Sequence, residues 1–125
     1  MSRTALVVDD SRAIRSLLKR LLAGFDFEIH EAGDGREALR CLAEIGAVDL
    51  VLVDWNMPEM DGLEFIKAVR AQPAYDRMVL VMVTSEGEPA NIARALMAGA
   101  DEYAVKPLSG EALVEKLQLV GLGEE

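Results

Sequence analysis

The chain has 125 residues, of which 51% are hydrophobic and 28% charged, a balance typical of one well-packed globular domain, and we expect residues 1–125 to form that single domain without an effector domain. Its 22 acidic against 13 basic side chains give a net charge of −9, which argues against nucleic acid or an anionic membrane surface as a partner. A single cysteine, Cys41, excludes an internal disulfide and a multi-cysteine zinc site, and the N-terminus has neither a signal-peptide core nor a membrane span, so we expect a cytoplasmic protein.

Strand-like and helix-like patterns alternate along the chain. Short apolar runs that end at polar residues predict buried strands at 4–8, 25–30, 49–53, 78–83 and 102–105. Apolar residues at helical spacing predict helices at 12–22, at 37–45, after Gly62, at 89–98, and from Ser109 to about Val120. Five strands alternating with five helices predict right-handed crossovers and an α/β fold, a doubly wound parallel sheet with helices on both faces.

Chemically active side chains follow four of these strands. Asp9 and Asp10 follow the first strand, Asp54 the third, Thr84 the fourth and Lys106 the fifth. Each has an ordinary explanation, since aspartates cap helices and a lysine is usually solvated. However, the functional crevice of such a sheet lies at the carboxyl ends of its strands, where all five residues fall together. A structural role for each one does not explain this coincidence.

The combination of carboxylates with a hydroxyl and an ammonium group suits phosphoryl chemistry. Crowded carboxylates repel one another, and a divalent cation with hard oxygen ligands, for which Mg²⁺ is the natural candidate, relieves that repulsion. Such an ion would hold one phosphoryl oxygen while Lys106 and Thr84 hold others. Asp54, on the central strand, is then best placed to be the nucleophile.

The arrangement resembles the receiver domains of two-component response regulators over essentially the whole chain, and within them the chemotaxis receivers of the CheY type. The resemblance is carried by four motifs: Asp9-Asp10, Asp54-Trp55-Asn56-Met57-Pro58-Glu59-Met60-Asp61-Gly62, Thr84-Ser85 and Lys106-Pro107. It implies the flavodoxin-like strand order 2-1-3-4-5 and phosphorylation of Asp54. It also implies that Asp10, Asp54 and the backbone carbonyl of Asn56 ligate Mg²⁺, while Asp9 acts mainly through a bound water.

The resemblance extends to the groups around the phosphoryl position. It implies that Thr84, the Ser85 amide and Lys106 bind the phosphoryl group, and that Tyr103 is a switch aromatic that turns inward as Thr84 moves toward the phosphate. Ser85 departs mildly from the alanine common at its position. Asn56 and Glu86 occupy the two positions that tune phosphate lifetime, and their pairing resembles that of fast-resetting receivers, which predicts a lifetime of seconds to minutes.

The partners follow from the same reading. His30, the only histidine, lies in a predicted strand, so the phosphoryl group must come from a separate histidine kinase or phosphotransfer protein, or from a small donor such as acetyl phosphate. Val114, Leu119 and Leu122 add apolar area to the last helix. With the fourth helix and fifth strand, they predict a face for a downstream protein, or for dimerisation of a monomer upon phosphorylation. Covering the helix ends is an equally good explanation of these residues.

Several functions fit these features to different degrees. The first is a stand-alone response regulator that controls the flagellar motor by protein binding. Such a protein is a phosphoacceptor rather than a turnover enzyme, although it assists its own phosphotransfer and autodephosphorylation. The alternative is a phosphorelay intermediate or phosphate sink. A dehalogenase-type hydrolase would place its nucleophile after the first strand, in an Asp-x-Asp motif. A flavodoxin-like carrier would have a phosphate loop where Asp9 and Asp10 would repel the flavin phosphate.

Overall fold

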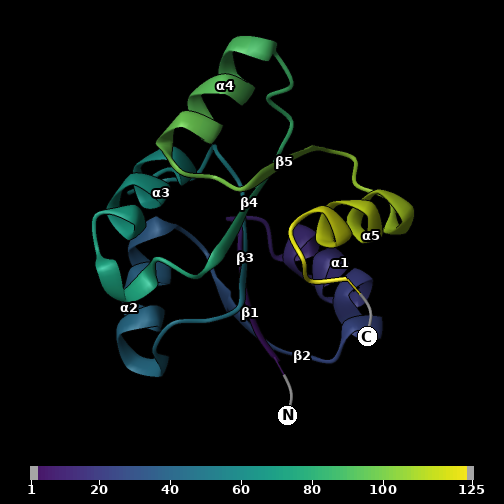
Figure 1. Ribbon diagram of the computed structural model, residues 1–125, viewed down its shortest axis with the longest axis horizontal. Helices are drawn as coiled ribbons and strands as arrows, with labels where there is room; N and C mark the ends of the chain where they lie inside the picture. Colours follow the sequence, from purple (N-terminus) through teal and green to yellow (C-terminus); the bar gives the residue numbers. More distant parts are fainter. Residues whose placement is uncertain (1–2, 124–125) are drawn as a thin grey trace.

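Five parallel strands form one sheet between two layers of helices in the computed structural model, which describes residues 3–123 (Figure 1). The strands are β1 (Arg3–Val8), β2 (Phe27–Ala32), β3 (Leu50–Val53), β4 (Val79–Thr84) and β5 (Glu102–Val105). They lie side by side in the order β2-β1-β3-β4-β5. The predicted doubly wound sheet and its strand order are therefore confirmed.

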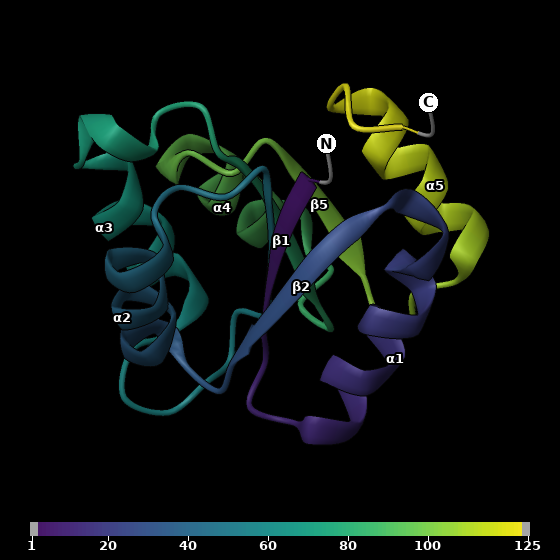
Figure 2. The same cartoon turned by 90° about the horizontal axis from the view of Figure 1, so that it is seen from below.

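Five helices cover the two faces of the sheet. They are α1 (Arg12–Leu22), α2 (Gly35–Ile45), α3 (Gly62–Arg70), α4 (Pro89–Ala98) and α5 (Gly110–Leu119). Figures 1 and 2 show α1 and α5 on one face and α2, α3 and α4 on the other. Polar side chains begin four of them, since Ser11, Asp34, Asp61 and Ser109 each accept a hydrogen bond from a backbone N–H of the first turn. Within residues 3–123, no helix has the length and hydrophobicity needed to cross a membrane.

The sheet divides the hydrophobic core into two clusters. β3 is buried on both sides because its side chains alternate, Leu50 and Leu52 facing α1 and α5 while Val51 and Val53 face the other helices. The larger cluster includes Phe65, Ile66 and Val69 of α3. The smaller one joins residues of α1 and α5: Leu18, Leu22, Leu113 and Leu117.

The second strand begins two residues later than predicted. Residues Ala23–Phe25 form a 3₁₀ turn, and Asp26 has a left-handed backbone with φ 57° that redirects the chain before β2. Phe25 belongs to this turn, and its side chain is buried in the smaller cluster. An apolar residue that the sequence assigns to a strand therefore contributes to the core from a turn. Tertiary packing thus overrides a short local pattern.

Arg3 ties the two ends of the described chain together. Its guanidinium donates to the carbonyl oxygens of Phe25 (2.9 Å) and Leu122 (3.3 Å) and lies over the Phe27 ring at 4.6 Å from the centroid. Leu122 is accordingly half-buried against the smaller cluster. Of the two explanations given for Leu122, this packing favours the one in which it covers the end of the helix, because the chain turns back over the core after α5.

Arg70 of α3 links two segments at the edge of the sheet where the strands begin, the one that precedes β4 and the one that precedes β5. Its guanidinium donates to the backbone oxygens of Gly99 (2.9 Å), Tyr75 (3.2 Å) and Met78 (3.0 Å), and to the carboxylate of Asp101 (2.9 Å). Such a set of bonds needs the fixed, planar array of donors that only arginine has.

Arg70→Lys is therefore expected to be destabilising although it keeps the charge. A lysine ammonium cannot reach carbonyls on several sides at once, and buried acceptors that lose a partner typically cost about 1–2 kcal/mol in total free energy of unfolding. Urea unfolding followed by circular dichroism would measure the loss. Arg36→Lys on the exposed face of α2 is the matched control, and an equal effect for both variants would contradict the assigned role.

Candidate functional site

Three carboxylates meet at the carboxyl ends of β1 and β3. The backbone N–H of Asp9 donates to Ala32 O (3.1 Å) and that of Asp54 to Val8 O (2.9 Å), so each residue continues the pattern of its strand by one position. Asp10 follows directly. One carboxylate oxygen from each of Asp9, Asp10 and Asp54 lies within 4.8 Å of the others. The predicted convergence of these side chains is observed.

The three carboxylates differ in their surroundings. Asp9 and Asp54 keep only 1% and 8% of their surface exposed, whereas Asp10 is open to solvent. Backbone donors hold the two buried groups, because Asp9 Oδ1 accepts from the Ser11 N–H (2.9 Å) and Asp54 Oδ1 accepts from the Trp55 N–H (2.8 Å). Their second oxygens remain directed toward the centre of the cluster.

Lys106, from the end of β5, completes this centre. Its ammonium donates to Asp9 Oδ2 (2.8 Å) and Asp54 Oδ2 (3.2 Å). Burial by itself would lower the pKa of the ammonium, but the hydrogen bond to Asp9 and the charges of Asp54 and Asp9 outweigh it and hold the pKa above its usual value. One ammonium against three carboxylates leaves an excess of negative charge. With an all-oxygen donor set and one solvent-accessible carboxylate, the cluster could hold a hard divalent cation.

The loop after Asp54 folds closely back on that residue. Gly62 donates its N–H to Trp55 O (2.8 Å), and a Cβ added at Gly62 would lie 2.1 Å from the Asp54 carbonyl oxygen. Only a glycine permits this contact. Asn56, in the same loop, is exposed, and its side-chain amide donates to Glu86 Oε2 (3.2 Å).

Glu86 connects the remaining predicted site residues. Thr84 is fully buried and its hydroxyl oxygen accepts from the Glu86 N–H (3.4 Å), while the neighbouring Ser85 is exposed. The Tyr103 hydroxyl donates to the backbone oxygen of Glu86, and the residue keeps only 4% of its surface exposed. Burial raises the pKa of Tyr103, and the charges of Glu86 and Asp54 add to this effect. In this structure Tyr103 therefore occupies the inward position.

Some contacts of the site could not be identified from the sequence. Arg15 of α1 donates to the backbone oxygen of Asp9 (2.6 Å), Asn91 of α4 donates to Glu86 Oε1 (3.4 Å), and the Arg94 guanidinium lies over the Trp55 ring. These residues stand on helices with no motif of their own. They come near the site only because α1 and α4 pack against the sheet.

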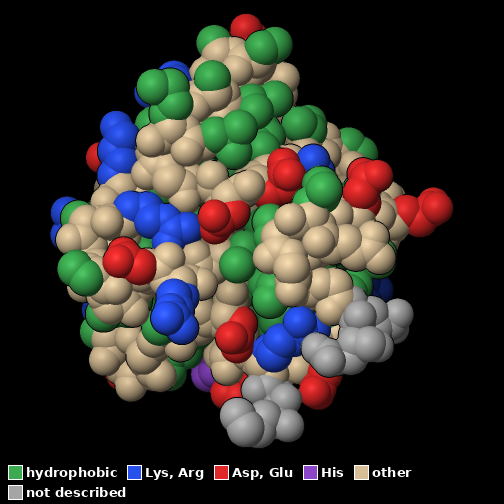
Figure 3. All heavy atoms as spheres, in the orientation of Figure 1, with side chains coloured by type: hydrophobic (Ala, Val, Ile, Leu, Met, Phe, Trp, Pro, Cys, Tyr) green, Lys and Arg blue, Asp and Glu red, His purple; other side chains and the backbone are tan. Residues whose placement is uncertain are grey.

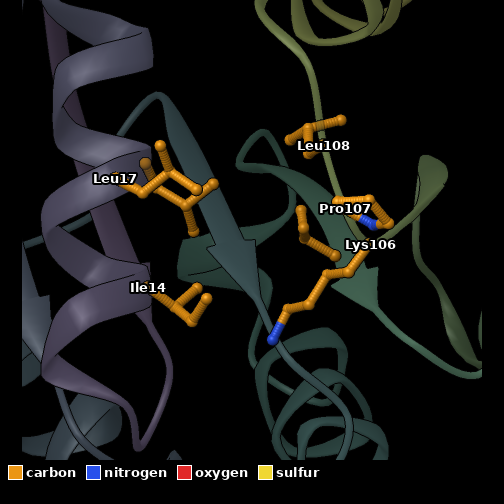
Figure 4. Close-up of a pocket in the computed structure, with 7 residues that line it drawn as sticks. Ile14, Leu17, Lys106, Pro107 and Leu108 are labelled. Carbon is orange, nitrogen blue, oxygen red and sulfur yellow. The ribbon is translucent and has the colours of Figure 1, made fainter.

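A cavity of about 240 Å³ lies between α1 and the segment that follows β5 (Figure 4). Apart from Lys106, it is lined by apolar residues: Ile14, Leu17, Leu18, Val83, Pro107 and Leu108. The aliphatic part of the Lys106 side chain lies along these apolar residues, and its nitrogen lies at the far end of the side chain. Apart from Lys106, the lining of the cavity contains no acid or base.

Comparison with known proteins agrees with this geometry. The family model described as the response regulator receiver domain matches residues 5–118. A chemotaxis protein CheY homolog of Campylobacter jejuni is 45% identical over 121 residues, which cover 94% of this chain and 92% of that protein. Chemotaxis protein CheY1 of Helicobacter pylori is 40% identical over 116 residues, covering 92% and 94%. The solved structure of chemotaxis protein CheY4 of Vibrio cholerae matches with a TM-score of 0.88 and 38% identity, over 96% of this chain and 99% of that one. The chain therefore belongs to the family of response regulator receiver domains, with relatives of the chemotaxis CheY type.

Proposed function

We propose that the chain accepts a phosphoryl group on Asp54 from a phosphohistidine of a histidine kinase or phosphotransfer protein, and then signals by binding a protein of the flagellar motor. The observation that carries this proposal is the meeting of Asp54 with Asp9 and Asp10 at one edge of the sheet, where Lys106 forms ion pairs with Asp9 and Asp54. The chemotaxis names of the relatives support the motor as the target.

The proposed transfer uses Oδ2 of Asp54, the carboxylate oxygen that faces Lys106. That oxygen forms a bond to phosphorus while the bond between phosphorus and the donor nitrogen breaks, and the electron pair leaves with the imidazole. The Lys106 ammonium, already beside Asp54 Oδ2, is placed to hold a phosphoryl oxygen. The hydroxyl of Thr84 and the N–H of Ser85 lie at the end of the adjacent strand, from where they would hold the others.

Asp10, Asp54 and the carbonyl of Asn56 would hold Mg²⁺, with Asp9 contributing through water. The exposed carboxylate of Asp10 and the excess negative charge of the cluster fit this ion. When bound, Mg²⁺ supplies positive charge that offsets the charge of the phosphoryl oxygens. Lys106 and the Trp55 N–H, for their part, hold the Asp54 carboxylate in one orientation.

The proposed signal passes from Thr84 to the exposed face of α4, β5 and α5. A hydrogen bond from Thr84 to the phosphoryl group would fix the segment that includes Glu86, whose backbone oxygen holds Tyr103 inward. Hydrophobic side chains gather over α4 and beside it in Figure 3. The exposed large hydrophobic residues of these three elements are Leu96, Met97, Val105, Val114 and Leu119. Because Met97 lies beside Leu63 of α3 and Val114 beside Leu21 of α1, we propose that Leu96, Val105 and Leu119 contact the target.

Incubation with acetyl phosphate and Mg²⁺, followed by intact-mass measurement, tests the chemistry. We expect one phosphoryl group on the wild type, none on Asp54→Asn, and none when the metal is chelated. Asp76→Asn, an exposed aspartate elsewhere, is the matched control and should behave as the wild type. After removal of the donor, the modification should decay in seconds to minutes.

Equal labelling of Asp54→Asn and the wild type would contradict the proposal. Capture of partners with and without beryllofluoride distinguishes the two outputs. A switch component bound only with beryllofluoride supports motor control, whereas loss of the phosphoryl group to a second histidine protein supports the relay alternative.

A further inference from the structure

We propose that α4 positions the two residues that follow Asp54, through the side chains of Arg94 and Asn91, and so sets the reactivity of the phosphoacceptor. This inference rests on the proposed function for its consequence, although the contacts themselves belong to the fold. It adds a path between α4 and the site that does not pass through Thr84 and Tyr103.

The first contact is between Arg94 and Trp55. The guanidinium carbon of Arg94 lies 5.4 Å from the centroid of the Trp55 ring, within the range of a cation–π interaction. Trp55 is only 8% exposed and belongs to the larger core cluster. Its backbone N–H is also the donor that holds Asp54 Oδ1. A side chain that fixes the indole therefore also restrains the carboxylate that would attack phosphorus.

The second contact runs through Glu86. Asn91 donates its side-chain amide to Glu86 Oε1 (3.4 Å), and Asn56 donates to Oε2 of the same carboxylate (3.2 Å). Glu86 thus bridges α4 to the residue whose carbonyl would ligate Mg²⁺. Asn91 and Arg94 are three positions apart and lie on one side of the helix, so a movement of α4 would affect both contacts together.

Few packing contacts hold α4 on the fold, so the free energy needed to move it is small. The helix begins without a side-chain cap, and Ala95 is its only fully buried residue, whereas α3 buries five of its nine residues. Because coupling between two sites is reciprocal at equilibrium, a partner that binds the exposed Leu96 would shift the phosphorylation equilibrium of Asp54 by the same factor by which phosphorylation changes the affinity of that partner.

Arg94→Ala tests the first contact in the unphosphorylated protein. We expect hydrogen exchange at the Trp55 amide to become about two- to fivefold faster and the dissociation constant for Mg²⁺, measured by calorimetry, to rise by a similar factor, as an exposed cation–π contact implies. For Arg94→Lys, both quantities should lie between those of the wild type and those of Arg94→Ala, since an ammonium keeps the charge but does not stack on the ring. Arg40→Ala, an exposed arginine of α2, is the matched control for lost helix charge and should leave both quantities unchanged.

A double-mutant cycle tests the second contact. Asn91→Ala should weaken Mg²⁺ binding by about twofold in the wild type, as expected for one modest hydrogen bond, and should have no further effect in a Glu86→Ala background. Wild-type exchange at Trp55 in Arg94→Ala, or equal effects of Asn91→Ala in both backgrounds, would overturn the inference. A protein that takes up no phosphoryl group contradicts the proposed function instead, while the amide exchange rates still decide between a positioning role for α4 and none.

Discussion

Gly62→Ala is expected to lower the free energy of unfolding by about 3 kcal/mol, a large effect for a single added methyl group. The new Cβ would lie 2.1 Å from the carbonyl oxygen of Asp54 and 2.9 Å from its carbonyl carbon. Both are backbone atoms at the end of the central strand and cannot move aside as a flexible side chain would. The loop from Trp55 to Gly62 would have to separate from the strand. Urea unfolding with fluorescence detection of Trp55 measures the change.

The same substitution should also disturb the site, because the displaced backbone carries Asp54, the proposed phosphoacceptor. We expect slower uptake of the phosphoryl group by the fraction of Gly62→Ala that remains folded. Gly24→Ala is the matched control: nothing lies within 4 Å of its added Cβ, so its stability should stay the same or rise by up to about 1 kcal/mol. A Gly62→Ala protein as stable as Gly24→Ala would show that the loop is not held against Asp54.

Lys106→Met should destabilise the protein by about 2 kcal/mol in the absence of divalent ions. Among the described residues, the ammonium is the only hydrogen-bond partner of Asp9 Oδ2 and Asp54 Oδ2, and its removal leaves buried negative charge unpaired. The loss is smaller than for a fully buried pair because the lysine side chain keeps 21% of its surface exposed. Saturating Mg²⁺ should restore part of the stability, since an ion that binds only the folded state stabilises it. Lys116→Met, which removes a more exposed pair with Glu102, should cost less than about 1 kcal/mol.

The effect of Lys106 should depend on pH in a defined direction. Its pKa in the folded protein is raised, so its contribution is fully present below the unfolded lysine value of about 10.4 and is lost as the pH rises through the folded value. The raised pKa of Tyr103 also makes the protein less stable as the pH rises. Because Tyr103 is present in both the wild type and Lys106→Met, its contribution cancels when their unfolding free energies are subtracted. The difference in unfolding free energy between the wild type and Lys106→Met should be constant from pH 7 to about 10 and shrink above. A difference that grows at alkaline pH would exclude the ion pair as its cause.

The parts of the fold that the sequence predicts well are those buried on both sides. The uninterrupted apolar residues of β3 can only be the centre of a covered sheet, and the polar residues after each strand then converge by topology alone. The start of β2 was predicted wrongly because Phe25 is apolar both as a strand residue and as the buried end of a 3₁₀ turn. Local composition does not distinguish these two cases.

The contacts of α4 could not be predicted for a different reason. Neither Arg94 over Trp55 nor Asn91 beside Glu86 has a sequence signal, since each depends on the angle at which α4 packs on the sheet. The inward position of Tyr103 is likewise a choice between two side-chain positions that the sequence leaves equally available. The convergence of the carboxylates follows from strand order, whereas the contacts of α4 with the site depend on how the helix packs.

The bond from Arg3 to the carbonyl of Leu122 has a practical consequence for experiments on living cells. It brings the beginning of β1 and the segment after α5 together, at the opposite end of β1 from the carboxylates (Figure 1). A fluorescent label attached near either residue would stand away from Asp54 and from the N-terminal turn of α4. Tagged protein should therefore still exchange phosphoryl groups, and its position in the cell could be followed during signalling.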